Sequence, residues 1–205
     1  MKVGIFISGT GTNMVAVCRN FLDRKLDGVE EISFVLSDKR SAPGLEKAEA
    51  MGIKTIVLPK RKEQTREDYE AELLKAIEPY DVGLLVLAGF MKVLGNRFLE
   101  GFRGRIINIH PSLLPSFKGV NAQSQAFEYG VKVSGCTVHF VDSTLDGGPI
   151  ILQQPVFRKN DDTDDTFRAR ILEQEHILLS KAVSIVCKGD YKICGRYVVL
   201  NQEEL

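Results

Sequence analysis

Short apolar runs alternate with longer stretches of helical periodicity through the first half of the chain. The apolar runs are rich in β-branched residues and lie at Val3–Ile7, Ile32–Leu36, Thr55–Leu58, Val82–Leu87 and Arg105–Ile109. The helix-like stretches lie at Asn13–Asp27, Pro43–Met51, Arg66–Ile77 and Leu94–Phe102. Continuous apolar strands between helices are typical of a sheet that helices cover on both faces. The pattern therefore predicts an α/β protein with a doubly wound, mostly parallel Rossmann-like sheet.

The second half of the chain departs from this alternation. Val133–Asp142 and Ile150–Phe157 are strand-like segments separated by a short turn, so we expect an antiparallel strand in the C-terminal half. A long helix is predicted over 163–187, with its apolar positions on one side. A small hairpin is predicted at Tyr191–Leu200, and residues 201–205 are expected to be loose.

Composition excludes several kinds of partner. The chain has 205 residues, 44% of them hydrophobic, which suits a single α/β domain. Its 27 Lys and Arg residues balance 27 Asp and Glu residues, so no basic excess favours nucleic acid or a membrane surface. The N-terminal apolar run is too short for a signal sequence, and no stretch is long enough to span a bilayer. We expect a cytoplasmic protein without nucleic-acid or membrane partners, either a monomer or a homodimer.

The cysteines and histidines do not form a metal-binding pattern. The chain has three histidines and four scattered cysteines, Cys18, Cys136, Cys187 and Cys194. This spacing favours reduced thiols and predicts no metal site. A contact between the last two cysteines stays open.

A glycine-rich loop separates the first predicted strand from the first predicted helix. Its sequence is Ser8-Gly9-Thr10-Gly11-Thr12-Asn13. Glycine lets a ligand approach the backbone closely, and the following helix offers unpaired N–H groups. The loop lacks the Gly-Lys-Ser/Thr of nucleoside triphosphate sites and the third glycine of dinucleotide sites. The pattern favours a site for one phosphate, and an ordinary turn between a strand and a helix is the alternative.

Asn108 and His110 lie at the end of the fifth predicted strand. Because side chains alternate along a strand, both point to the same face, at the edge where open α/β sheets bind ligands. Asp146 lies in the Asp-Gly-Gly turn between the two later strands. Together these side chains suggest a catalytic site. A structural histidine, a capping asparagine and an ordinary Asp-Gly turn are the alternative interpretation.

From Lys2 to about Val186, the chain resembles the family of glycinamide ribonucleotide formyltransferases, within the folate-dependent formyltransferase superfamily. The motifs that carry the resemblance are the glycine loop, Leu87-Ala88-Gly89-Phe90-Met91, Asn108-Ile109-His110-Pro111-Ser112-Leu113-Leu114-Pro115, Cys136-Thr137-Val138-His139-Phe140-Val141, Leu145-Asp146-Gly147-Gly148-Pro149 and Glu173-Gln174-Glu175-His176. The Asn-x-His-Pro-Ser-Leu-Leu-Pro string marks the superfamily, and the glycine loop points to this member.

The resemblance implies transfer of a formyl group from 10-formyltetrahydrofolate, a co-substrate, to the amine of glycinamide ribonucleotide in de novo purine synthesis. The catalytic residues would be Asn108, His110 and Asp146. The acceptor would be bound by Gly11, Thr12 and Asn13 at its phosphate and by Glu175 at its ribose. The folate would be bound by Arg66, Met91, Lys92, Val93, Leu94, Val141, Asp142, Ser143, Thr144 and Leu145.

The resemblance also implies a mechanism and a division of the chain. The amine would attack the formyl carbon directly, and protonated His110 and the Asn108 amide would donate to the oxygen of the tetrahedral intermediate. Asp146 would favour the cationic form of His110 and relay a proton through water. Residues 1–104 would form the acceptor phosphate-binding half, 105–188 the catalytic and folate-binding half, and 189–205 a short C-terminal extension.

Two positions depart from the family pattern, and two further histidines match it. Lys92 stands where arginine is expected, so it keeps the charge but loses the bidentate fork that suits a carboxylate. Gln123 stands where histidine is common and receives no catalytic role. His139 is expected to pack within its strand or support the site indirectly, and His176 is expected to be structural.

Other functions stay open at this stage. The nearest are methionyl-tRNA formyltransferase, formyltetrahydrofolate hydrolase and a sugar-nucleotide N-formyltransferase. The tRNA enzyme is expected to have a further C-terminal domain, and the hydrolase an N-terminal regulatory domain. A non-catalytic phosphate-binding α/β module is an alternative of another class.

Overall fold

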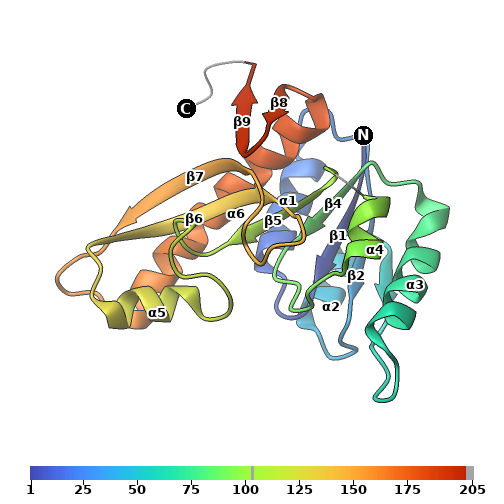
Figure 1. The fold of residues 1–205 in the computed structure, drawn as a ribbon, viewed down its shortest axis with the longest axis horizontal. Coiled ribbons are helices and arrows are strands. Elements are labelled where there is room, and N and C mark those ends of the chain that lie inside the picture. The colour runs from blue at the N-terminus through green and yellow to red at the C-terminus, as the bar shows by residue number, and fades with distance from the viewer. Residues whose placement is uncertain (103, 202–205) are drawn as a thin grey trace.

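Residues 1–102 and 104–201, which the computed structural model describes, form a nine-stranded sheet in the order β3-β2-β1-β4-β5-β6-β7-β9-β8 (Figure 1). The strands are β1 (Lys2–Ile7), β2 (Glu31–Ser37), β3 (Thr55–Val57), β4 (Leu84–Leu87), β5 (Ile106–His110), β6 (Val133–Phe140), β7 (Ile150–Phe157), β8 (Tyr191–Cys194) and β9 (Tyr197–Leu200). The first five pair in parallel, whereas β6 pairs antiparallel with both β5 and β7. The predicted sheet, its antiparallel strand and the C-terminal hairpin are therefore confirmed.

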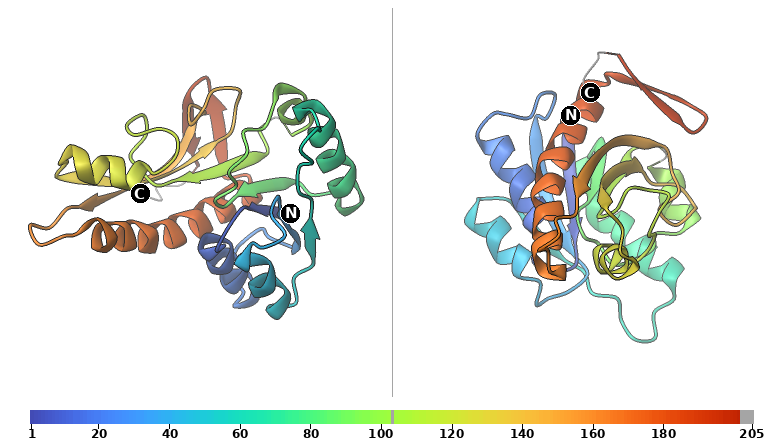
Figure 2. Two further views of the ribbon diagram at one scale, coloured as in Figure 1. Left: turned by 90° about the horizontal axis from the view of Figure 1, so that it is seen from below. Right: turned by 90° about the vertical axis from the view of Figure 1, so that its left-hand side faces the viewer.

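Helices cover both faces of this sheet (Figure 2). They are α1 (Thr12–Leu22), α2 (Pro43–Ala50), α3 (Arg66–Ile77), α4 (Asn96–Gly101), α5 (Ala122–Tyr129) and α6 (Asp164–Lys188), with a short 3-10 helix η1 (Glu78–Tyr80). Alternate residues of β1 divide between two cores. Val3, Ile5 and Ile7 pack with side chains of α1 and α6, whereas Phe6 packs with side chains of α3 and α4. The alternation along one central strand thus joins both helix layers to the sheet.

Two helices differ from the prediction. The first helix, predicted to reach Asp27, ends at Leu22, and Arg24 just beyond it has a left-handed φ of 57° that a continuing helix does not allow. Helix α5 is absent from the predicted elements because its eight residues are too few for a clear periodicity. Apart from the short η1, which was not predicted, the other elements match the predicted ranges to within two residues. The loose end predicted at 201–205 lies outside the described residues from residue 202 onward.

Two expectations from the sequence concern membrane-spanning segments and the cysteines. None of the helices in the described part of the chain has an apolar stretch that could span a bilayer. All four cysteines are free thiols, so the contact left open between Cys187 and Cys194 is not a disulfide. Burial raises the pKa of Cys18 and of Cys136 to about 12, which keeps both thiols protonated at neutral pH.

We expect Phe6→Ala to lower the free energy of unfolding by about 3–5 kcal/mol, because deleting a fully buried ring leaves a cavity. The Phe6 ring is T-shaped against Phe90 and Phe98, with centroids 5.1 and 6.2 Å apart. Urea unfolding measures the loss. Phe157→Ala removes a mostly exposed ring and is the control, with an expected loss of no more than about 1 kcal/mol. Equal losses in the two variants would contradict a tightly packed second core.

Candidate active site

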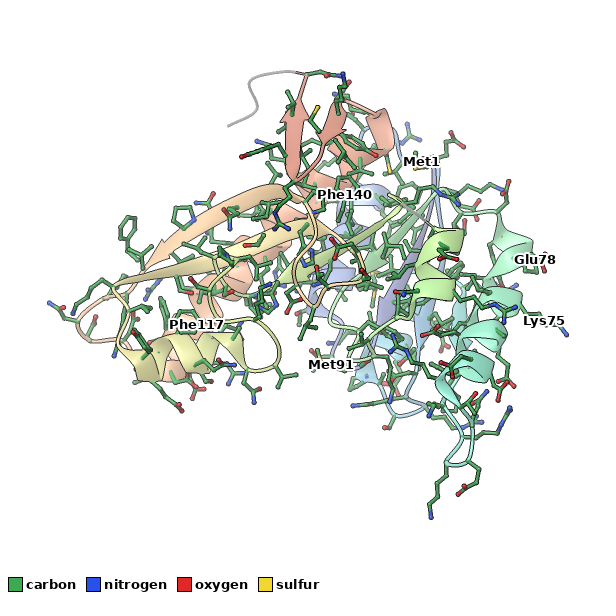
Figure 3. All side chains as sticks on the ribbon, viewed as in Figure 1. Met1, Lys75, Glu78, Met91, Phe117 and Phe140 are labelled. Carbon is green, nitrogen blue, oxygen red and sulfur yellow. The ribbon has the colours of Figure 1, made fainter. Side chains whose placement is uncertain are left out.

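The polar side chains that the sequence points to lie at the carboxyl ends of β1, β4 and β5, around the point in the sheet where a doubly wound fold forms its crevice. β1 is flanked by β2 on one side and β4 on the other, so the chain order of the strands reverses there. Doubly wound sheets bind ligands at such a point. The Ser8 backbone N–H donates to the Gly89 carbonyl at 3.0 Å and so joins the loops after β1 and β4. Met91 and Phe117 lie on the loops that leave β4 and β5 (Figure 3).

His110 and Asp146 lie side by side, as the catalytic interpretation requires. Nδ1 of His110 is 3.4 Å from Oδ2 of Asp146, and both side chains are largely buried. Nε2 of His110 is 2.8 Å from the Phe117 carbonyl. Because a carbonyl only accepts, Nε2 carries a hydrogen. A doubly protonated His110 would therefore donate to an acceptor at each end of its ring.

Asn108 is oriented by His139, which lies opposite it on β6. Nδ1 of His139 is 2.8 Å from the Phe140 carbonyl and so carries the hydrogen, which leaves Nε2 to accept from the Asn108 amide at 3.2 Å. Burial lowers the pKa of His139, which favours this neutral form. Oδ1 of Asp146 lies 3.8 Å from the same Nε2. His139 thus supports the site through Asn108, one of the two roles expected for it.

The turn between β6 and β7 holds the Asp146 carboxylate in place. Asp146 has a φ of 45°, in the left-handed region that few non-glycine residues adopt. A Cβ at Gly148 would lie 1.9 Å from the Phe140 carbonyl oxygen, so the turn can close only on glycine there. The Gly119 backbone N–H donates to Oδ2 of Asp146 at 2.8 Å. The carboxylate is therefore positioned both by its own turn and by the loop after β5.

The glycine loop leads into a helix whose first backbone N–H groups have no side-chain cap. Gly11 has a φ of 66°, and a Cβ there would lie 3.0 Å from the Gly44 Cα, so both conformation and space require glycine. α1 begins at Thr12 without a side-chain cap, and the first N–H groups of a helix lack intrahelical acceptors. Lys47 on α2 donates to the Thr10 carbonyl at 2.8 Å. The loop therefore combines helix N–H groups with a nearby cation, which suits an anion.

Glu175 lies beneath this loop and is held by two amides. Asn13 Nδ2 donates to one carboxylate oxygen at 2.7 Å, and Gln123 Nε2 donates to the other at 3.2 Å. Burial raises the pKa of Glu175. Gln123, for which no catalytic role is expected, lies on α5, which was not predicted. Through its bond to Glu175 it lies beside the residues expected to bind the acceptor. His176 follows on α6, where partial burial lowers its pKa.

The two cations expected at the folate each face a buried acid. Lys92 Nζ is 3.8 Å from Oδ2 of Asp38, and Oδ1 of the same carboxylate accepts a hydrogen bond from the Ser8 hydroxyl. Arg66 begins α3, and its Nε donates to Glu70 at 2.9 Å. The side chains of Arg66 and Lys92 are 47% and 43% exposed, so both remain accessible to a ligand.

Large apolar side chains are exposed on the loops around the crevice. They are Met91 and Val93 after β4, Val120 after β5 and Leu145 in the β6–β7 turn. Exposed apolar groups gathered on such loops are typical of a ligand site. The other residues expected at the folate differ in exposure: Leu94 is buried in the second core, Val141 is half-buried, and Asp142, Ser143 and Thr144 are exposed.

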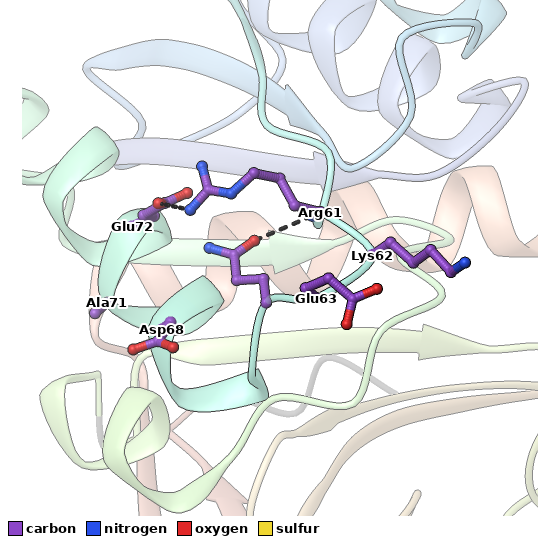
Figure 4. A pocket seen from close by; sticks show the side chains of 7 residues that line it. Arg61, Lys62, Glu63, Asp68, Ala71 and Glu72 are labelled. Carbon is purple, nitrogen blue, oxygen red and sulfur yellow. Dashed lines mark hydrogen bonds and ion pairs between the residues drawn. The ribbon is translucent and has the colours of Figure 1, made fainter.

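No group of three or more His, Cys, Asp or Glu side chains in the described ranges could hold a metal ion. A hollow of about 740 Å³ lies beside α3, where Arg61 pairs with Glu72 (Figure 4). It is lined by Arg61, Lys62, Glu63, Gln64, Asp68, Ala71 and Glu72. None of the residues expected to bind acceptor or folate lines this hollow.

Comparison with known proteins identifies the family. The formyl transferase family model matches residues 1–183. The chain is 39% identical over 193 residues to phosphoribosylglycinamide formyltransferase of Escherichia coli (strain K12), a match that covers 94% of this chain and 90% of that relative. It is 42% identical over 193 residues to the trifunctional purine biosynthetic protein adenosine-3 of Gallus gallus. That match covers 94% of this chain but only 19% of the relative, so the chain spans about a fifth of the trifunctional protein.

A solved structure gives the same result. The crystal structure of glycinamide ribonucleotide transformylase 1 from Symbiobacterium toebii matches with a TM-score of 0.94 and 40% sequence identity, over 98% of this chain and 93% of that chain. The fold, the family match and the motifs in the crevice agree, and the chain belongs to the formyl transferase family.

Proposed function

We propose that the chain transfers the formyl group of 10-formyltetrahydrofolate to the amine of glycinamide ribonucleotide, a step of de novo purine synthesis. The observation that carries the proposal is the convergence of Asn108, His110 and Asp146 at the crevice beside the glycine loop. Membership in the formyl transferase family supports the reaction type, and the names of the relatives support the acceptor. The folate donor is what the resemblance in the sequence motifs implies.

The proposed reaction proceeds by direct attack. The acceptor nitrogen forms a bond to the formyl carbon, and the carbonyl oxygen becomes an oxyanion in a tetrahedral intermediate. The bond between that carbon and the folate nitrogen then breaks, and the proton lost by the amine is returned to the folate nitrogen. Asp146 would relay this proton through water.

Two donors are available for the oxyanion. The Asn108 amide nitrogen has two N–H groups, and only one can point to His139, so the second is left for the oxygen. His110 Nε2 donates to the Phe117 carbonyl, and the substrate oxygen would replace that acceptor. In either case Oδ2 of Asp146, 3.4 Å from Nδ1, would accept from a ring protonated at both nitrogens.

The substrates would lie on opposite sides of these donors. The phosphate of the acceptor would bind the N–H groups of Gly11, Thr12 and Asn13, with Glu175 at the ribose. The folate would lie over the exposed apolar loops, with its glutamate carboxylates toward Arg66 and Lys92.

We further propose that three parts of the chain serve different purposes. Residues 1–104 would serve mainly the acceptor phosphate, residues 105–188 catalysis and the folate, and residues 189–205 would be an extension. We also propose a cytoplasmic protein that acts as a monomer or homodimer. The folate is a co-substrate in this scheme, and no role is assigned to a metal.

Substitution of the three central residues tests the mechanism. We expect Asn108→Ala to lower kcat by about 100-fold or more, as when one oxyanion donor is lost. Asp146→Asn and His110→Asn should be at least as damaging, and their combination little worse than the worse single variant, because the pair acts as a unit. Turnover is measured as appearance of deformylated folate with glycinamide ribonucleotide present, and ligand affinities are measured in parallel.

Three outcomes of that experiment would contradict the proposal. Wild-type kcat in Asp146→Asn would refute the acid–base scheme. Deformylation at the same rate without the acceptor would indicate the hydrolase instead. Binding of both ligands without turnover in the wild type would indicate a non-catalytic module.

The phosphate site makes a separate prediction. Glycinamide riboside, which lacks the phosphate, should have a kcat/KM lower by about 100-fold, because the helix N–H groups and the Lys47 charge would face no anion. This comparison uses the wild-type protein, since any side chain at Gly11 would strain the loop even without a ligand. Equal kcat/KM for the two acceptors would remove the phosphate from the glycine loop.

The lowered pKa of His139 predicts a pH dependence of stability. The unfolded histidine takes up a proton below its ordinary pKa of 6.5, whereas the folded one stays neutral to lower pH. The folded state therefore loses stability as the pH falls through this range. We expect the free energy of unfolding to fall more steeply from about pH 7.5 to pH 5.5 in the wild type than in His139→Gln. Parallel pH profiles from urea unfolding would show that His139 is not held neutral.

A further inference from the structure

Glu70 is a buried carboxylate whose donors come from both parts of the expected folate site. It lies on α3 with a side chain that is 4% exposed. Its Oε1 accepts from the Arg66 Nε at 2.9 Å and from the Gly95 backbone N–H at 2.6 Å. Gly95 ends the connection from β4 to α4, and the last part of this connection, the 91–95 loop, includes Lys92 and Val93. One carboxylate thus joins the cation at the start of α3 to the loop that carries the other expected folate contacts.

Gly95 is packed directly against this ion pair. A Cβ at that position would lie 2.8 and 2.9 Å from the two Glu70 oxygens and 3.1 Å from the Arg66 Nε. Its φ of −86° is open to any residue, so a side chain here would be opposed by the Glu70–Arg66 pair and not by the backbone conformation. The 91–95 loop is therefore in close contact with the Glu70 carboxylate.

The two terminal nitrogens of the Arg66 guanidinium remain available to bind a ligand. Only Nε is engaged by Glu70, and the two terminal nitrogens of a guanidinium carry four more N–H donors in a planar fork. That fork suits a carboxylate. Because Glu70 holds the Nε edge, it restricts the directions in which the fork can point.

Stability alone is a weak reason to bury an acid here. Replacing a buried ion pair with apolar residues is often neutral or stabilising, and the rest of the buried face of α3 is apolar, with Tyr69, Leu73 and Ile77. We propose that Glu70 is a positioning residue for the formyl donor: it aims Arg66 at the carboxylates of the donor's glutamate tail and holds the 91–95 loop, which carries Lys92, the other cation expected at that tail. This inference rests on the proposed function, which takes Arg66 and the loop as folate-binding elements.

The test compares two formyl donors. 10-Formyltetrahydrofolate carries the glutamate tail, and 10-formyltetrahydropteroate lacks it. We expect Glu70→Gln to raise KM for the folate by roughly tenfold, the effect of losing about one charge-assisted hydrogen bond. KM for the pteroate should rise much less, and kcat should change little with either donor. Arg66→Ala should show the same selectivity, and the double variant should be no worse than Arg66→Ala.

Glu72→Gln is the matched control. Glu72 lies on the same helix and pairs with Arg61 at the hollow of Figure 4, which no residue of the 91–95 loop lines, so its loss breaks a more exposed Arg–Glu pair without touching that loop. Both KM values should stay at the wild-type level. Gly95→Ala is a second test that keeps the carboxylate but pushes a methyl group against it, and it should again raise KM selectively for the folate.

The outcomes separate this inference from the function on which it rests. One result would overturn the positioning role: Arg66→Ala raises KM more for the folate than for the pteroate, but Glu70→Gln raises both KM values equally. Glu70 would then only accept the Gly95 N–H at the start of α4. An unchanged KM for the folate in Glu70→Gln overturns the positioning role as well. If Arg66→Ala itself fails to discriminate the donors while the wild type transfers the formyl group, the folate contact of Arg66 is wrong and this inference falls with it. An absence of transfer in the wild type refutes the proposed function itself.

Discussion

A carboxylate that is buried away from water needs hydrogen-bond donors from the protein, and this requirement determines how the crevice is arranged. Asp146 receives the Gly119 N–H and faces the ring of His110, two groups from β5 and the loop that follows it. The turn that carries Asp146 comes from a distant part of the chain and is strained at that residue. The site can therefore assemble only when β5, its loop and the β6–β7 turn are all in place.

The same rule applies at three other buried acids around the crevice, Asp38, Glu70 and Glu175. Their partners are Ser8 and Lys92 for Asp38, Arg66 and Gly95 for Glu70, and Asn13 and Gln123 for Glu175. Each acid thus connects two segments that surround the site. Buried ion pairs add little net stability, but an acid without its partners is costly, so these contacts favour one arrangement of the loops over others.

The change from parallel to antiparallel pairing at β5 has a chemical consequence. Because β6 runs against β5, His139 comes to lie directly opposite Asn108. The neutral ring accepts one amide hydrogen and thereby fixes which end of the Asn108 side chain presents nitrogen to the crevice. An amide free to turn over would offer oxygen as readily as nitrogen, and an oxygen would repel an oxyanion.

The sequence by itself determined the fold class and the positions of most elements, because apolar periodicity reports directly which faces must be buried. It also placed Asn108 and His110 on one face, since strand alternation is a local property. Only the tertiary structure decided the partners of the site residues: Asn108 and His139 are 31 residues apart, Gln123 and Glu175 are 52 apart, and Glu70 and Gly95 are 25 apart. Such pairs depend on strand order, register and the position of α5, whose eight residues carry too little periodicity to be recognised before they pack. Local pattern therefore sets which groups are present at the crevice, whereas long-range packing sets which of them meet.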